Sequence, residues 1–304
     1  LAPKPSEIKL FRSSFLTEDR FNPAYQYAPE DQTGYRSSFN PIRLVASRAR
    51  FLDDSNKPYL LFVAFSFPQS LSQFRMDEML NLEVTFDYDL HYSLIVRDSY
   101  LDEIQRITTE PVASLDHTGV LRLDHAPQQA WYTLAAEAFP RDAAEADDNP
   151  QRLPGVGQEQ FEALPPLSAD PKQLEISDLV IGVEPPAEFD QSLLPFPVVP
   201  STQIWKIDAL KVYFEVYHLK MKNSQAHFSL EFRVYRLDKK DGKYQRKEMT
   251  SSIFDFAATH STAKETFGIS VANLKKGEYE LEAEVKDKNS GKKVRRNARF
   301  VVLE

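Results

Sequence analysis

Apolar and polar residues alternate with a period of two along several stretches of this chain, and this periodicity constrains the fold more than any other sequence feature. In residues 81–97 (NLEVTFDYDLHYSLIVR), apolar side chains occupy every second position from Leu82 to Leu94. Successive side chains of a β-strand point to opposite faces, so this spacing predicts a half-buried antiparallel strand. The stretches 208–219 and 226–237 alternate in the same way. The pattern predicts an all-β fold.

Strand-like segments separated by short turns fill the C-terminal part of the chain. Two turns, Asp238–Gly242 and Lys288–Gly291, each end in a glycine suited to a positive φ angle. The strands expected in this part are 172–183, 208–219, 226–237, 266–271, 277–287 and 295–303. Six strands with short turns predict an antiparallel β-sandwich of immunoglobulin-like type. Upstream, we expect strands at 36–51, 58–68, 81–97, 103–109, 119–124 and 129–139, and a short helix at 71–80.

Proline distribution predicts the domain boundary. Eleven of the 20 prolines lie between Pro140 and Pro200, and none follows Pro200. Proline lacks an amide donor and fixes φ, so this span is unsuited to central strands or long helices. We therefore expect residues 141–171 to form a Pro-rich acidic linker that joins two antiparallel immunoglobulin-like β-sandwich domains. The N-terminal domain is expected at residues 1–140, with an extended N-terminal arm, and the C-terminal domain at residues 172–304.

Charge is distributed unevenly along the chain. Residues 201–304 carry 21 lysines and arginines against 14 acidic residues, a net of +7, whereas residues 1–200 carry 16 against 31, a net of −15. Such asymmetry is typical of a basic partner-binding face or of self-association between opposite charges. It also arises when two domains simply differ in composition. Basic residues alternate with glutamate instead of forming a block, which argues against nucleic-acid binding.

Composition excludes several classes of chemistry. The chain contains no cysteine, which rules out disulfides, thiolate zinc sites, iron–sulfur clusters and cysteine nucleophiles. No apolar run approaches the ~20 residues that a membrane-spanning helix needs, so we expect no transmembrane segment. The chain starts at Leu1 without a basic and apolar leader, and we expect any signal peptide or lipidated cysteine to lie upstream of it.

Several C-terminal segments resemble a known family. The segments that carry the resemblance are LEISDL (174–179), LKVYFEVYHL (210–219), LKKGEYEL (274–281), residues 285–293 and residues 300–302. In this order they are similar to the C-terminal β-sandwich region of the GWxTD-domain proteins, and residues 58–68 (PYLLFVAFSFP) resemble a strand of the same family. The Gly-Trp-x-Thr-Asp motif itself is absent. The resemblance implies sandwich architecture and export to the periplasm, the outer-membrane surface or the extracellular space, and it implies no catalytic role.

Two Asp–His pairs are the strongest candidates for a reactive site. Asp116 and His117 precede a segment around Gly119, and Asp124 and His125 follow it. An aspartate can orient an imidazole as a base or a metal ligand, and on a hairpin the two pairs would face each other. No HxH or HExxH spacing supplies a third ligand. We therefore interpret these residues as solvated loop residues first and as a metal site second.

The remaining titratable candidates lie on predicted strands. His91, His218 and His227 lie inside predicted strands and have no partner at ligand spacing. His218 shares a strand face with Phe214 and Val216 and is expected to pack there, half-buried. Asp87 and Asp89 share a strand face, which fits either paired carboxylates of a glycoside hydrolase or an ordinary solvent face. The alternating residues Glu278, Glu280, Glu282 and Glu284 predict a solvated acidic face that pairs across a hairpin with Lys292, Arg295, Arg296 and Arg299.

Five aromatic residues are candidates for a binding surface: Trp131, Trp205, Tyr213, Tyr217 and Tyr235. Exposed aromatic side chains serve as protein-docking residues and as sugar-stacking platforms. We expect a non-catalytic exported protein without cofactor or metal that docks to protein partners or self-assembles at the bacterial cell envelope. The alternative is a carbohydrate-binding accessory module of a larger secreted system. A metal-dependent enzyme around His117 and His125 is a third hypothesis.

Overall fold

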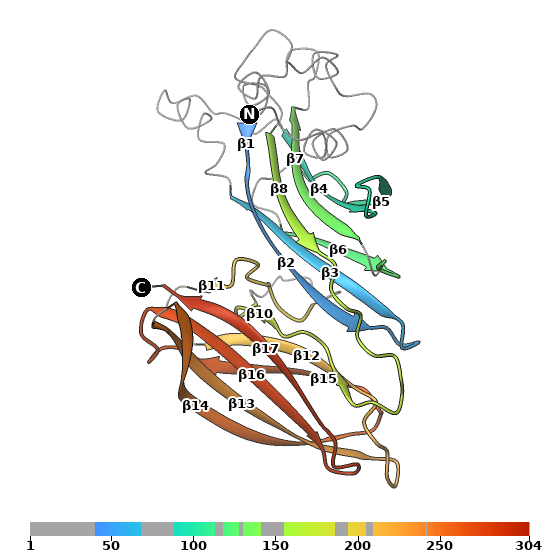
Figure 1. Ribbon diagram of the computed structural model, residues 1–304, viewed down its shortest axis with the longest axis vertical. Coiled ribbons are helices and arrows are strands. Elements are labelled where there is room, and N and C mark those ends of the chain that lie inside the picture. The colour runs from blue at the N-terminus through green and yellow to red at the C-terminus, as the bar shows by residue number, and fades with distance from the viewer. Residues whose placement is uncertain are drawn as a thin grey trace. The chain divides into compact units, whose positions relative to one another are not determined.

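The computed structural model describes residues 40–67, 88–112, 118–127, 130–140, 155–185, 194–204, 209–240 and 242–303 (Figure 1). These ranges contain strands and loops but no helix, which confirms the all-β prediction. Within them, accordingly, no helix has the length and apolar character to span a membrane. The short helix expected at 71–80 lies outside the described residues.

The chain separates into two compact units. The first comprises Leu1–Ser47 and Phe62–Pro165, and the second comprises Arg48–Leu61 and Pro166–Glu304. The segment Arg48–Leu61 is the tip of a hairpin whose base belongs to the first unit. The second unit therefore contains a short piece of chain that sequence position alone would assign to the first.

Strands of the first unit, together with the whole hairpin whose tip belongs to the second, form two sheets. Their bounds are β1 (Asn40–Pro41), β2 (Arg43–Leu52), β3 (Pro58–Phe67), β4 (Tyr88–Arg97), β5 (Glu103–Thr108), β6 (Thr118–Asp124), β7 (Trp131–Pro140) and β8 (Gly155–Glu162). One sheet has the order β1-β8-β7-β4-β5 and the other the order β2-β3-β6. Phe62 of β3 contacts Tyr132 of β7 and Phe161 of β8, with ring centroids 5.6 and 5.8 Å apart. The two sheets thus share an apolar core, as in a sandwich.

Strands of the second unit also form two sheets. Their bounds are β9 (Glu175–Ile176), β10 (Val180–Gly182), β11 (Gln203–Ile204), β12 (Ala209–Tyr217), β13 (Ala226–Lys240), β14 (Lys243–Ala258), β15 (Ala263–Ser270), β16 (Gly277–Asp287) and β17 (Lys293–Val302). One sheet has the order β10-β12-β15, with β9 also paired to β12, and the other has the order β11-β17-β16-β13-β14. Phe214 of β12 and Phe232 of β13 meet edge to face at 6.3 Å. Both sheets contribute to one large core cluster, so this unit is also sandwich-like.

Several strands differ from the sequence-based expectations. The single strand expected at 172–183 is divided into β9 and β10, and the short strand β11 was not expected. Strand β8 lies inside the range 141–171 expected to be a linker, and it pairs along its length with β7. Residues 155–162 contain no proline, so the proline argument applies only to the segments that flank them. Strand β14 forms where no strand was expected, because its residues show no simple alternation of apolar and polar positions.

Candidate functional site

Strand β12 is buried on both faces. Its even positions face the sandwich core, as the alternation predicts, with Phe214 fully buried. Its odd positions Tyr213 and Tyr217 were expected to be interface aromatics, yet they are only 9% and 1% exposed. The hairpin tip covers them: Phe51 lies 6.1 Å from the Tyr213 ring, and Leu52 packs in one cluster with Leu167 and Tyr217. Neither tyrosine is therefore available as a docking or sugar-stacking platform.

A buried carboxylate lies at the centre of this covered face. The hydroxyl of Tyr213 donates a hydrogen bond to Oε1 of Glu215, and the hydroxyl of Tyr217 donates one to Oε2 at 3.1 Å. The Nζ of Lys264 lies 3.6 Å from Oε1. Burial, and next the negative charge of Glu215, raise the pKa of both tyrosines. Both hydroxyls therefore stay protonated and act as donors to Glu215, so neither is a candidate nucleophile.

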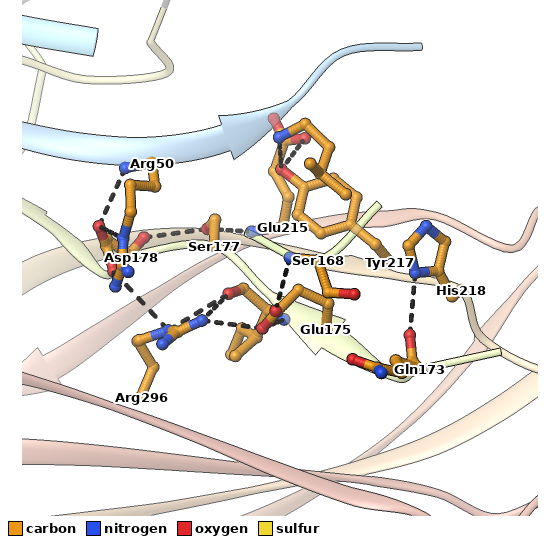
Figure 2. A network of polar contacts seen from close by, with 12 residues as sticks. Arg50, Ser168, Gln173, Glu175, Ser177, Asp178, Glu215, Tyr217, His218 and Arg296 are labelled. Atoms are coloured by element: carbon orange, nitrogen blue, oxygen red, sulfur yellow. Dashed lines mark hydrogen bonds and ion pairs between the residues drawn. The ribbon is translucent and has the colours of Figure 1, made fainter. Parts of the chain in front are cut away.

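An ion-pair chain links the hairpin tip to β17 (Figure 2). Asp178 accepts hydrogen bonds from the backbone N–H of Arg50 at 2.9 Å and from its guanidinium at 2.7 and 2.8 Å. On the other side, Nε of Arg296 lies 3.7 Å from Asp178, and the guanidinium bonds Glu175 at 2.8 Å and the carbonyl of Ile176 at 2.8 Å. Residues 175–178 thus lie between two arginines from distant parts of the chain.

His218 makes a second contact with the hairpin tip. Its Nδ1 lies 2.9 Å from the carbonyl oxygen of Gln173, and its Nε2 lies 3.2 Å from Oδ1 of Asn56. His218 and Asn56 both adopt left-handed backbone conformations, with φ of 61° and 58°. The histidine expected to pack therefore connects a loop to the hairpin turn. We call the ion-pair chain of Arg50, Asp178 and Arg296, together with these His218 contacts, the anchor of the hairpin tip.

Strand β14 offers a different kind of site, because it is exposed along most of its length. Residues 243–255 are all exposed, and β14 is the last strand in its sheet order, beside β13 (Figure 1). Four large apolar side chains on it are exposed: Tyr244, Met249, Ile253 and Phe254. The pairing with β13 shifts between Val234 and Tyr235, so Met249 lies at a β-bulge.

The outer face of β16 is more buried than expected. Glu280, Glu282 and Glu284 are between 5% and 9% exposed. Glu284 is paired with Lys293 and Arg295, and Glu282 with Arg233 and Arg246. The expected solvated acidic face is therefore wrong, because basic side chains from three neighbouring strands cover the carboxylates. Of the expected cross-hairpin partners, Arg295 and Arg299 pair as predicted, Arg296 pairs with Glu175, and Lys292 bonds the carbonyl of Lys172.

The Asp–His candidates are only partly described. Asp116, His117 and Trp205 lie outside the described residues. Asp124 is exposed and pairs with Arg122 at 2.9 Å, and His125 occupies the exposed turn after β6. Across the described ranges, no group of three metal-binding side chains comes together.

Of the other two candidate aromatics, one is exposed and the other is half-buried. Trp131 is 41% exposed at the start of β7. Tyr235 lies beneath the guanidinium of Arg246, whose Cζ is 3.8 Å from the ring centroid.

A buried histidine–carboxylate pair joins β4 to β7 in the first unit. Nε2 of His91 lies 2.9 Å from Oε2 of Glu137, and the hydroxyl of Ser93 donates to the same oxygen at 2.9 Å. Phe139 stacks on the His91 ring at 5.4 Å. Both His91 and Ser93 are bound to the carboxylate, so the cluster cross-links the strands instead of forming a serine–histidine pair.

Sequence reasoning missed the anchor around Asp178. Arg50 and Asp178 are 128 positions apart, and Arg296 is 120 positions from Ile176. No local spacing pattern links such residues.

No protein-family model matches the chain, and no curated protein matches it significantly.

Proposed function

We propose that this protein is a non-catalytic interaction protein that docks to protein partners or self-assembles, and that β14 is its contact surface. The proposal rests on one observation, the run of exposed residues 243–255 on an edge strand. Edge strands carry backbone N–H and C=O groups that pair readily with another chain, and natural proteins usually shield long ones. Exposed apolar side chains at Ile253 and Phe254 add surface that a partner would cover.

We further propose that the two units are separate immunoglobulin-like domains. The strand order supports this for the second unit, because β10-β12-β15 corresponds to strands A, B and E of such a sandwich. In the order β11-β17-β16-β13-β14, strand β11 then corresponds to a short extension of strand A, and β17, β16, β13 and β14 correspond to strands G, F, C and C′. Under this assignment β14 is the C′ edge strand.

Export to the periplasm, the outer-membrane surface or the extracellular space completes the proposal. Its support is the resemblance of residues 174–179, 210–219 and 274–281 to the GWxTD-domain proteins. The opposite net charges of residues 1–200 and 201–304 further predict that association weakens as salt rises, since exposed charges are screened over about 10 Å at 0.1 M.

Hydrogen exchange on the native assembly tests the proposal. Amide exchange would be compared between the protein in the assembly isolated from its source and the purified chain at high dilution. We expect slower exchange of β14 amides in the assembly, because an added strand satisfies the edge groups. Edge strand β5 of the other unit serves as the control and should exchange equally in both samples. Equal exchange of β14 in both samples would contradict the proposal.

A further inference from the structure

We infer that β14 pairs antiparallel with β14 of a second copy of this chain, over residues 250–258 and about a two-fold axis near Phe254. This inference rests on the proposed function and names its partner. Residues 250–258 pair without interruption with β13, from Ala258 opposite Ala226 to Thr250 opposite Val234. Among the described strands, none pairs with the other side of β14. The bulge at Met249 ends this regular run, and Phe254 is its midpoint.

The side chains of this run suit pairing with themselves. Residues 250–258 (TSSIFDFAA) contain no proline or glycine and a single charge, Asp255. That charge is already paired within the chain, with Lys288 Nζ at 2.6 Å. Ile253 is 67% exposed and Phe254 is 46% exposed, on opposite faces of the strand. A short apolar run of low charge on an exposed edge is the type of segment that pairs with an identical strand.

The position of the two-fold axis at Phe254 sets which residues of the two copies face each other. A two-fold axis at Phe254 places that residue opposite its own copy and Ile253 opposite Asp255, so no two like charges face each other. It also places Ser251 opposite Ala257.

The distribution of charge along β14 favours antiparallel pairing of the two copies over parallel pairing. Lys243, Arg246 and Lys247 lie at one end of β14, and antiparallel pairing keeps the two basic ends apart. Parallel pairing in register would stack them on one another, which is unfavourable. The two-fold contact uses the same patch on both copies and therefore closes at a dimer.

Cysteine cross-linking tests the register, because the chain has no cysteine of its own. A mixture of the variants Ser251→Cys and Ala257→Cys should form a mixed disulfide under mild oxidation, since these positions face each other. Each variant alone should form far less, because residue 251 and its own copy would be about 20 Å apart at 3.3 Å per residue. Ile104→Cys, on exposed edge strand β5, is the control and should not cross-link. Efficient self-cross-linking of Ser251→Cys would overturn the antiparallel register.

A charge-reversal pair tests the same register without cysteine. Ile253→Glu would place a carboxylate opposite Asp255 twice in each dimer, and Ile253→Lys would place an ammonium there. We expect the dimer dissociation constant, measured by sedimentation, to be about tenfold higher for the glutamate variant than for the lysine variant. Equal weakening by both variants would overturn the register.

A wild-type chain that stays monomeric at every concentration and forms no mixed disulfide would overturn the second copy as partner. If β14 amides were still protected in the native assembly, the proposed function would stand with a different partner. If they were not, both proposals would fall.

Discussion

The hydroxyl of Tyr217 accepts a hydrogen bond from the backbone N–H of Leu52 at 3.0 Å, although the two residues are 165 positions apart in the sequence. The same hydroxyl donates to Glu215 at 3.1 Å. Leu52 ends strand β2, and its side chain is buried beside Tyr217. One phenol therefore satisfies a buried donor of the hairpin tip and a buried acceptor of β12.

Replacing this phenol tests how the hairpin tip is held. Tyr217→Phe keeps the ring but leaves the Leu52 N–H and one oxygen of Glu215 without this partner, so we expect a loss of about 2 kcal/mol in the free energy of unfolding. Hydrogen exchange of the Leu52 amide should accelerate as well. Tyr244→Phe removes the same atom from a tyrosine that is 44% exposed, and it should change stability little. Unchanged exchange at Leu52 would show that the tip is held by other contacts.

A double-mutant cycle on Arg50 and Asp178 tests the ion-pair chain. Their side chains are only 16% and 19% exposed, and Arg50 donates three hydrogen bonds to the Asp178 carboxylate. We expect a coupling free energy of about 1–2 kcal/mol from Arg50→Ala and Asp178→Ala. The exposed pair Arg122 and Asp124, at 41% and 57%, is the control and should couple by less than about 0.5 kcal/mol. Equal coupling in the two cycles would contradict a special role for Asp178.

The sequence predicts those strands in which an apolar face packs against the sandwich core. The strand expected at 277–287 is β16, with the same bounds, and the alternation in 208–219 and 226–237 correctly marks the core faces of β12 and β13. Strand β14 was missed because both its faces are exposed over residues 243–255 and a bulge breaks its period. Period-two patterns record burial of one face, so a strand exposed on both carries no such signal.

The candidate site was harder to predict because its residues meet only through the tertiary fold. Tyr213 and Tyr217 alternate with charged residues, and this pattern was interpreted as an exposed face. The hairpin tip covers that face, and nothing within β12 indicates a cover that comes from residues 48–61. The polar position between them, Glu215, is satisfied by the two tyrosine hydroxyls, so it remains compatible with burial.

Gly119 of β6 tests the core of the first unit. A Cβ at this position would overlap the Tyr92 ring, which is fully buried and whose hydroxyl bonds Ser66 at 3.1 Å. We therefore expect Gly119→Ala to lower the free energy of unfolding by about 2 kcal/mol, the usual cost of overpacking. Thr118→Ala, at the exposed neighbouring position, should change it by less than about 0.5 kcal/mol. Denaturant unfolding of both variants provides the comparison, and equal stability would show that the Tyr92 ring can move aside.

Acid should weaken the second unit through the buried glutamates of β16. The hydrogen bond from Lys293 lowers the pKa of Glu284, burial opposes this, and a hydrogen bond from Arg295 adds to the lowering. Burial alone would raise the pKa of Glu282, but hydrogen bonds from Arg246 and Arg233 outweigh it and the net pKa is lowered. A carboxylate whose pKa is lower in the folded state stabilises the fold above its ordinary value of about 4.3. That stabilisation is lost as the pH falls from this value through the folded-state pKa.

Glu284→Gln should therefore reduce stability by about 1 kcal/mol at neutral pH, since its partners Lys293 and Arg295 are partly exposed. The difference between wild type and variant should shrink toward zero as the pH falls below about 4. Burial raises the pKa of Glu159 and Glu265, so protonation of these two groups favours the folded state as the pH falls. Both groups are present in wild type and variant, so their contribution cancels in the difference between the two. Glu278→Gln, on the same strand but exposed, is the control with a small difference at every pH. Urea midpoints between pH 7 and pH 3 measure both series, and a Glu284→Gln difference that stayed constant across this range would contradict the ion-pair assignment.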